Sequence, residues 1–152
     1  MRVVGGMLLA ILFMSVPTAE AAVRKYTTQE LCSLANLIVI ATVQQREPMW
    51  LDQAQTTVVT TVTLSVERTI VGNPGSTVSV TTLGGKIGDV EQLVGDEPLM
   101  PVGARYFLLL NAPGDTPPAL IGGSYGARRL DSTAQLATSA ELYAEWRGMC
   151  DK

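Results

Sequence analysis

The chain has 152 residues, a formal net charge of −3, 47% hydrophobic residues, two cysteines and no histidine. This length allows one domain with its own hydrophobic core and leaves no room for a second. Lysine and arginine are scattered rather than gathered in a stripe, so we expect no nucleic-acid partner. The lack of histidine removes the commonest general base and the commonest zinc ligand, so we expect no catalytic residues, no metal and no cofactor.

The first 21 residues have the pattern of a secretory signal peptide. Arg2 gives a positive start, an apolar run extends from Val3 to Val16, and Ala19-Glu20-Ala21 is a small-x-small cleavage site. A membrane-spanning helix needs about 20 apolar residues, more than this run contains. We therefore expect cleavage before Ala22, one mature domain over residues 22–152, no transmembrane segment after cleavage, and a secreted or periplasmic location.

The two cysteines, Cys32 and Cys150, lie near opposite ends of the mature chain. In an oxidising compartment such a pair is usually bonded, and closing a loop of this length contributes about 4 to 5 kcal/mol on the chain-entropy model. The alternative is two separately buried thiols, because each cysteine falls on the apolar side of a predicted helix. The compartment favours the disulfide.

A short helix is the first predicted element of the mature chain. Thr27 and Glu30 match a capping box, and the helix ends near Asn36. The β-branched run from Leu37 to Val43 then predicts a buried strand. The segment from Gln44 to Gln55 is polar and contains Pro48 and Trp50, so it predicts a loop.

Alternation of apolar and polar residues predicts the next strands. It is regular from Thr56 to Glu67 and resumes from Ser76 to Leu83 after a Gly/Pro turn, which indicates a hairpin with one buried face. Further strands are expected over Ala104–Asn111 and over Ala119–Leu130, the second kinked at its glycines.

A closing helix follows the strands. Ser132-Thr133-Ala134-Gln135 is a second capping box, and apolar residues recur after it at helical spacing: Leu136, Ala140, Tyr143, Trp146 and Cys150. This stripe should dock on the sheet. Because a small antiparallel sheet must hide its edges, the elements together predict a mainly β fold, a small closed or partly open five-stranded antiparallel barrel with a short N-terminal helix and a C-terminal helix.

The order of short helix, LANLIVIATV, Trp-bearing loop, TTVTLSVERTIVGNPG, VGDEPLMPVGARYFLLL and IGGSYGARRL resembles that of a group of uncharacterised bacterial exported proteins. These in turn are similar to netrin-like modules, the OB-type barrel of the tissue inhibitors of metalloproteinases. The resemblance covers about residues 27–130 and implies a netrin-like barrel. Those inhibitors bind the target's zinc through a mature N-terminal cysteine. This chain is predicted to begin at Ala22, with Cys32 inside a helix, so the resemblance does not carry that inhibition over.

Several motifs superficially suggest chemistry. Ser124 lies in a Gly-x-Ser-x-Gly pattern, but the strand-to-helix context and the histidine partner of a nucleophile elbow are missing. The residues 84–88 lack the spacing of a phosphate loop. Four acids of the following loop match no calcium motif and are expected to be solvated: Asp89, Glu91, Asp96 and Glu97.

The remaining candidates indicate a non-enzymatic binding module that contacts a protein partner in the cell envelope or outside the cell. Its contact surface is expected to be formed by two loops at one barrel end, Arg46–Gln55 and Gly84–Pro101. Trp50, Asp96 and Glu97 are the candidate contact residues. Trp50 is either an exposed binding residue or a lid that folds back on the barrel end, and the lid is favoured. The alternatives to a binding module are a hydrolase that uses carboxylates alone, Glu67 included, and a structural accessory of the cell envelope.

Overall fold

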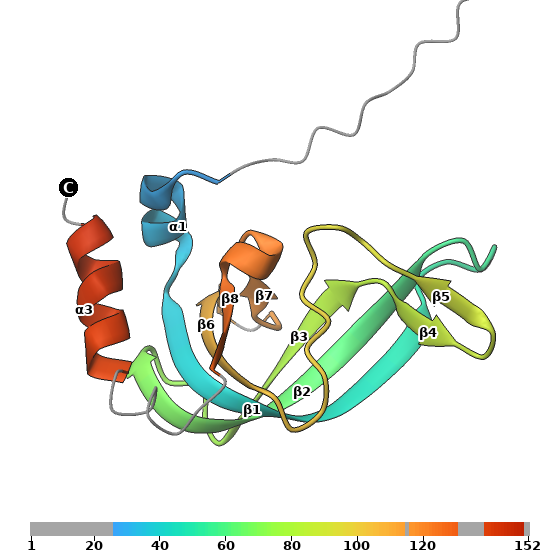
Figure 1. The fold of residues 1–152 in the computed structure, drawn as a ribbon, viewed down its shortest axis with the longest axis horizontal. Helices are drawn as coiled ribbons and strands as arrows, with labels where there is room; N and C mark the ends of the chain where they lie inside the picture. Colours follow the sequence, from blue (N-terminus) through green and yellow to red (C-terminus); the bar gives the residue numbers. More distant parts are fainter. Residues whose placement is uncertain (1–25, 115, 131–138, 151–152) are drawn as a thin grey trace, which may run out of the picture.

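The computed structural model describes residues 26–114, 116–130 and 139–150, which form a mainly β fold with a helix near each end (Figure 1). The helices are α1 (Thr28–Leu34) and α3 (Ser139–Cys150). Between them lie β1 (Leu37–Trp50), β2 (Val58–Val71), β3 (Thr77–Leu83), β4 (Gly85–Ile87), β5 (Val90–Gln92), β6 (Arg105–Asn111), β7 (Ala119–Leu120), the short 3-10 helix η1 (Gly123–Tyr125) and β8 (Ala127–Leu130). The predicted signal peptide, its cleavage site and the second capping box lie outside the described residues.

Six of these strands form one antiparallel sheet in the order β3-β2-β1-β6-β7, with β8 also paired to β6. β4 and β5 form a separate two-stranded sheet. The large sheet is strongly curved (Figure 1) but is not closed into a barrel, because within the described chain β3 pairs only with β2. A mainly β fold is therefore confirmed, whereas the expected five-stranded barrel is corrected to a sheet of six antiparallel strands that is not closed.

β1 from Leu37 to Thr42 pairs with β6 from Arg105 to Leu110, and the paired residues are buried on both faces except for Thr42 and Arg105 at one end. On one face, here called the inner face, Val39 joins the larger core cluster together with side chains of β2, β3 and β6. On the other, the outer face, Ile40 joins a second cluster that α1 and α3 cover. Burial on both faces explains why these two segments are continuous apolar runs rather than alternating ones.

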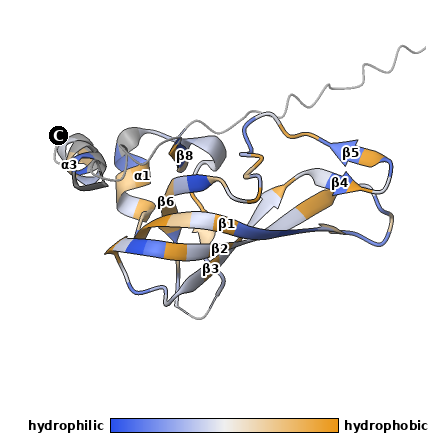
Figure 2. Cartoon of the chain, turned by 60° about the horizontal axis from the view of Figure 1, so that its bottom comes forward, coloured by the Kyte–Doolittle hydropathy of each residue, from blue (hydrophilic) through white to orange (hydrophobic). Residues whose placement is uncertain are grey.

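β1 continues to Trp50, so the loop expected over Gln44–Gln55 is wrong for residues 44–50 and is confirmed only for residues 51–55. Its second part pairs with β2 up to a tight turn. In this turn the Asp52 carboxylate accepts hydrogen bonds from the backbone N–H groups of Thr56 at 3.0 Å and Thr57 at 2.9 Å, and the Thr56 bond above all lowers the pKa of Asp52. The second part of β1 is largely exposed, so most of its side chains are polar and its sequence has no apolar pattern that would predict a strand. Figure 2 shows β1 passing from hydrophobic colours near α1 to hydrophilic ones toward β4 and β5.

β2 and β3 form the hairpin that the alternation predicts. Val62 and Val80 are paired on the inner face, where both are buried. Thr63 and Ser79 are paired on the outer face, with their hydroxyl oxygens 3.3 Å apart. The period of two thus separates a core side from an exposed side, as expected for a half-buried sheet.

The expected last strand is interrupted by η1, so that β7 and β8 pair with different parts of β6. Gly126, where the chain re-enters the sheet, passes so close to the backbone of Ile121 that a Cβ atom would overlap its carbonyl oxygen. The glycines that predicted a kink therefore permit a complete break in the strand.

α1 begins at the predicted capping box. The backbone N–H of Glu30 donates to the Thr27 hydroxyl at 3.2 Å, and the backbone N–H of Thr27 donates to the Glu30 carboxylate at 2.9 Å. Leu31 and Ala35 then pack against the outer core cluster. The capping box thus starts the helix where its apolar side can cover the sheet.

Cys32 of α1 and Cys150 of α3 form a disulfide, with their Cα atoms 5.5 Å apart. The pairing agrees with the one favoured from the sequence. Tyr143 of α3 packs against the outer core cluster, whereas the docking of the whole predicted stripe stays a prediction. Leu136 and the side chains of Ala140 and Trp146, three members of the predicted stripe, lie outside the described part of the chain.

Candidate functional site

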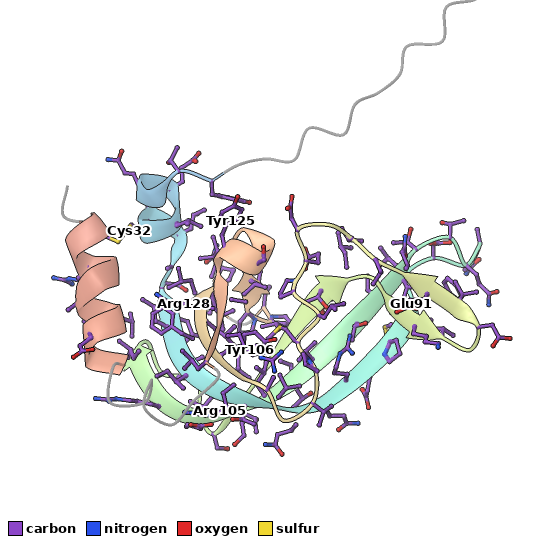
Figure 3. All side chains as sticks on the ribbon, viewed as in Figure 1. Cys32, Glu91, Arg105, Tyr106, Tyr125 and Arg128 are labelled. Carbon is purple, nitrogen blue, oxygen red and sulfur yellow. A yellow bond between two sulfur atoms is a disulfide. The ribbon has the colours of Figure 1, made fainter. Side chains whose placement is uncertain are left out.

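A groove with a volume of about 470 Å³ opens on the inner face between the β4–β5 hairpin and the start of β6, within the size range of ligand sites. We call it the hairpin groove. Its principal lining side chains are Arg46 of β1, Lys86 of β4, Glu91 of β5, Leu93 and Leu99 of the following segment, Tyr106 of β6 and Arg129 of β8. Figure 3 labels Glu91 on the hairpin side and Tyr106 on the β6 side.

The hairpin groove is cationic, although the chain has a net negative charge. Arg46, Lys86 and Arg129 contribute positive charge, and Glu91 is the one carboxylate among the described lining residues. Lys86 lies directly opposite Glu91 in the β4–β5 register. Two apolar side chains at the rim are largely in solvent, Leu93 at 69% and Leu99 at 64% exposure. The groove therefore offers positive charge beside accessible apolar surface.

Arg46 lines the groove, and its Nε atom is buried without a hydrogen-bond partner among the described residues. A small adjoining cavity of about 10 Å³ is lined by Arg46, Gln92 and Glu97, enough for roughly one water molecule. Burial raises the pKa of Glu97, although a hydrogen bond from the backbone of Leu83 opposes the rise. A buried donor on a cation is costly when it is unpaired, so Arg46 favours a ligand that brings an acceptor.

Two glycines let the β4–β5 hairpin cross closely over the inner face. The hydroxyl of Thr60 donates to the carbonyl of Gly84 at 2.7 Å, and the backbone N–H of Val58 donates to Oε1 of Gln92 at 2.6 Å. A Cβ atom at Gly85 would overlap the hydroxyl oxygen of Thr60, and this position has φ +141. Only glycine allows the approach that forms this wall of the groove.

The segment from β5 to β6 forms the opposite wall. Met100 is fully buried in the inner core cluster. The backbone N–H of Ser124 donates to the carbonyl of Asp96 at 2.8 Å, and the N–H of Gly103 donates to the carbonyl of Val43 at 2.8 Å. These contacts fix a segment that has little regular secondary structure.

None of the three predicted contact residues lines the hairpin groove. Trp50 is half-buried at the end of β1 and is not among the lining residues of the hairpin groove. Asp96 has an exposed side chain, while its carbonyl bonds the segment to η1. Glu97 is half-buried and lines the small adjoining cavity. Trp50, Asp96 and Glu97 therefore stay predictions as contact residues.

Sequence reasoning missed the cationic side chains of the groove. Arg46 and Lys86 lie within the two segments expected to form the contact loops, but the sequence gives no reason to single out either side chain. One pattern in the sequence could have indicated the position of Arg46. Arg46, Pro48 and Trp50 are alternate residues, so in a strand they lie on the same face. That pattern becomes useful only once residues 44–50 are recognised as a strand.

The candidate catalytic groups have structural roles or exposed positions. Ser124 is exposed within η1. Glu67 accepts hydrogen bonds from Arg105, Nε to Oε1 at 2.9 Å and a terminal nitrogen to Oε2 at 2.6 Å, and a further hydrogen bond from the Thr42 hydroxyl. The Arg105 bonds lower the pKa of Glu67 and keep it ionised. Within the described residues no cluster of three or more acids and cysteines is arranged to hold a metal ion.

A second cavity of about 420 Å³ lies at the other end of the sheet, where β3 approaches β7. Its described lining residues are uncharged and include Asn36, Asn73, Thr77 and Ser79. It lacks the convergent charge of the hairpin groove, so the hairpin groove is the stronger candidate site.

A scan against protein-family models found no match, and a search of curated protein sequences found no significant relative. Among the described residues, no helix has the length and apolar character needed to cross a membrane.

Proposed function

We propose that this protein is an exported, non-enzymatic binding module that holds a partner protein in the hairpin groove. The observation that carries the proposal is the convergence of Arg46, Lys86 and Arg129 beside exposed leucines in one concavity of about 470 Å³. Concave sites that combine apolar surface with a few directed polar groups are the usual places of ligand binding. The contact surface is the hairpin end of the sheet, the region where the loops of a binding module were expected.

The arrangement of carboxylates favours binding over hydrolysis. A hydrolase that works with carboxylates alone needs two of them across one site. Among the described lining residues, Glu91 is the one carboxylate of the groove, whereas Glu67 is held in an ion pair by Arg105. The proposal depends on the groove and not on the resemblance to netrin-like modules.

Export is part of the proposal. The signal pattern of residues 1–21 supports it, and the disulfide between Cys32 and Cys150 fits an oxidising compartment. The intact mass of the secreted protein tests this point, with a chain that begins at Ala22 as the expected result. Recovery of a species that keeps residues 1–21 would contradict it.

The binding proposal is tested by affinity capture of partners from the envelope fraction and the medium of the producing cell. Three baits are compared: the wild type, the double variant Arg46→Glu/Lys86→Glu, and Arg68→Glu. Arg68 is exposed on β2 and is not a lining residue of the groove, so its substitution reverses a charge outside the groove, by half the total change of the double variant.

We expect a protein that the wild type and Arg68→Glu retain and that the double variant loses. Circular dichroism and thermal unfolding verify that all three baits are folded. A partner retained equally by all three baits would place the interaction outside the hairpin groove and overturn the assignment.

A further inference from the structure

The second part of β1 is an open sheet edge beside the hairpin groove. β6 pairs with β1 only as far as Thr42, and Val43 makes the last flanking bonds, to Ala104 and Gly103. A β-bulge follows between Val43 and Gln45, and β1 then continues to Trp50 with β2 on one side. No described strand pairs with its other edge from residue 44 to 50. Such an edge presents unpaired backbone groups that can accept another strand.

The ladder with β2 fixes which backbone groups point to the open edge. The N–H of Leu51 donates to the carbonyl of Thr57 at 2.8 Å. Because hydrogen-bonded and non-bonded pairs alternate in an antiparallel ladder, the backbone groups of residues 49, 47 and 45 also face β2. Those of Arg46, Pro48 and Trp50 therefore face away from it. Pro48 occupies one of the outward positions, where its missing N–H costs no bond with β2.

The same three residues direct their side chains to the inner face, because Arg46 is paired with Val62, a member of the inner core cluster. The open edge and the hairpin groove are thus adjacent and share Arg46. The backbone offers the N–H groups of Arg46 and Trp50 together with outward carbonyls, and the groove offers positive charge and exposed leucine side chains.

We propose that the open edge of β1 binds an extended, acidic and apolar peptide segment of the partner protein by strand addition. The backbone of the segment pairs with residues 46–50, and alternate side chains enter the hairpin groove, where a carboxylate bonds to Arg46. Three features favour this occupant: the unpaired edge, the excess of cations in the groove, and the buried Nε of Arg46 that lacks an acceptor. The inference rests on the proposed function and specifies its partner and binding mode.

The probe is a display library of random ten-residue peptides, selected on the mature protein with its disulfide intact. We expect enrichment of sequences in which Asp or Glu alternates with apolar residues. Synthetic versions of the enriched peptides should bind Arg46→Glu at least about tenfold more weakly than the wild type, and Arg68→Glu equally well. Failure to enrich any family, or enrichment of basic peptides, overturns the inference.

A matched pair of variants separates the role of the backbone from that of the side chain. Arg46→Ala and Arg46→Pro both remove the guanidinium, but only proline also removes the outward N–H. We expect Arg46→Pro to bind the peptides about threefold more weakly than Arg46→Ala, the effect of one lost hydrogen bond. Equal binding overturns strand addition while leaving the proposed function intact, because the groove would still be the site.

A second readout does not depend on the folding of any variant. Peptides N-methylated at alternate backbone nitrogens keep their side chains but cannot pair along one edge. One of the two methylation registers should abolish binding to the wild-type protein, and binding of the unmodified peptide should protect the amide hydrogens of Arg46 and Trp50 from exchange. Unchanged exchange at both amides overturns the inference. The inference is also overturned if the wild type sediments as a dimer and Arg46→Pro sediments as a monomer. That result would mean that a second copy of the chain occupies the edge.

Discussion

The two parts of β1 differ in nearly every physical respect. From Leu37 to Val43 the strand lies between β2 and β6 and is buried on both faces, except for the half-buried Thr42. From Gln44 to Trp50 it has β2 on one edge only and exposed or half-buried side chains. The first part is therefore specified by burial of apolar surface, and the second by its backbone ladder and the Asp52 turn. Stability is concentrated in one part of the strand, and groups available for binding lie in the other.

The helices and the disulfide belong to the first part. α1 and α3 cover the outer core cluster there, and the bond between Cys32 and Cys150 ties them to each other. The β4–β5 hairpin lies at the end of the molecule away from α1 and α3 (Figure 1). This hairpin lines the hairpin groove, together with exposed apolar side chains such as Leu93 and Leu99. Loss of contacts should thus be costly near the helices and tolerated near the hairpin.

The largest effect is expected from removing the disulfide. The double variant Cys32→Ser/Cys150→Ser should lose about 4 to 5 kcal/mol of stability, because the bond closes a loop with a sequence separation of 118. Urea unfolding of the variant and of the oxidised wild type measures the difference. A loss below about 1 kcal/mol would show that α3 is held by packing alone and would weaken the contrast between the two parts of the molecule.

A pair of truncations compares the two parts directly. Leu109→Ala opens a cavity in the outer core cluster and should cost about 2 to 5 kcal/mol. Trp50→Ala, at the half-buried end of β1, should cost about 1 to 2 kcal/mol, despite the larger side chain that it removes. Thermal unfolding of both variants tests the order. If Trp50→Ala is as damaging as Leu109→Ala, Trp50 is a core lid and the hairpin end has a core of its own.

The sequence predicts elements well where one physical cause dominates. Alternation identifies β2 and β3, the capping box at Thr27 identifies the start of α1, and the cysteine pair is correctly joined. The strand through Gln44–Trp50 is missed because its polar residues satisfy no burial pattern and because Pro48 is tolerated only on an open edge. The groove is missed for a different reason, since Arg46 and Arg129 are far apart in sequence and only the tertiary fold brings them together.

The Arg105–Glu67 ion pair provides a smaller, pH-dependent effect on the covered part of the sheet. Both side chains are partly exposed, at 18% and 33%, so Glu67→Gln should cost about 1 kcal/mol or less. The hydrogen bonds from Arg105 lower the pKa of Glu67 below its ordinary value of 4.5. The folded chain therefore holds this proton more weakly than the unfolded chain, so the stabilisation is present above 4.5 and is lost as the pH falls through the lowered pKa.

Unfolding measured across this acidic range should show the wild type and Glu67→Gln converging at the lowest pH. A constant difference would mean that the side chain acts through packing rather than through charge. Glu47→Gln is a suitable control, because Glu47 is an exposed carboxylate of the open part of β1.

The smallest effect is expected at Glu97, and its sign is opposite. Burial raises the pKa of this carboxyl above its ordinary value of 4.5, so the folded chain binds the proton more tightly than the unfolded chain does. Ionisation of Glu97 then opposes folding: the cost is absent below 4.5, develops as the pH rises toward the raised pKa, and is complete above it. Glu97→Gln should slightly stabilise the protein at neutral pH and leave it unchanged at acidic pH.

Asp96→Asn should give a weaker gain in stability, because the charge of Asp96 is the lesser cause of the raised pKa of Glu97. Unfolding midpoints over this pH range test both variants. A Glu97→Gln variant that is less stable than the wild type at neutral pH would contradict the prediction. It would show that the ionised carboxylate stabilises the hairpin end, for example by pairing with Arg46 across the small cavity that they share.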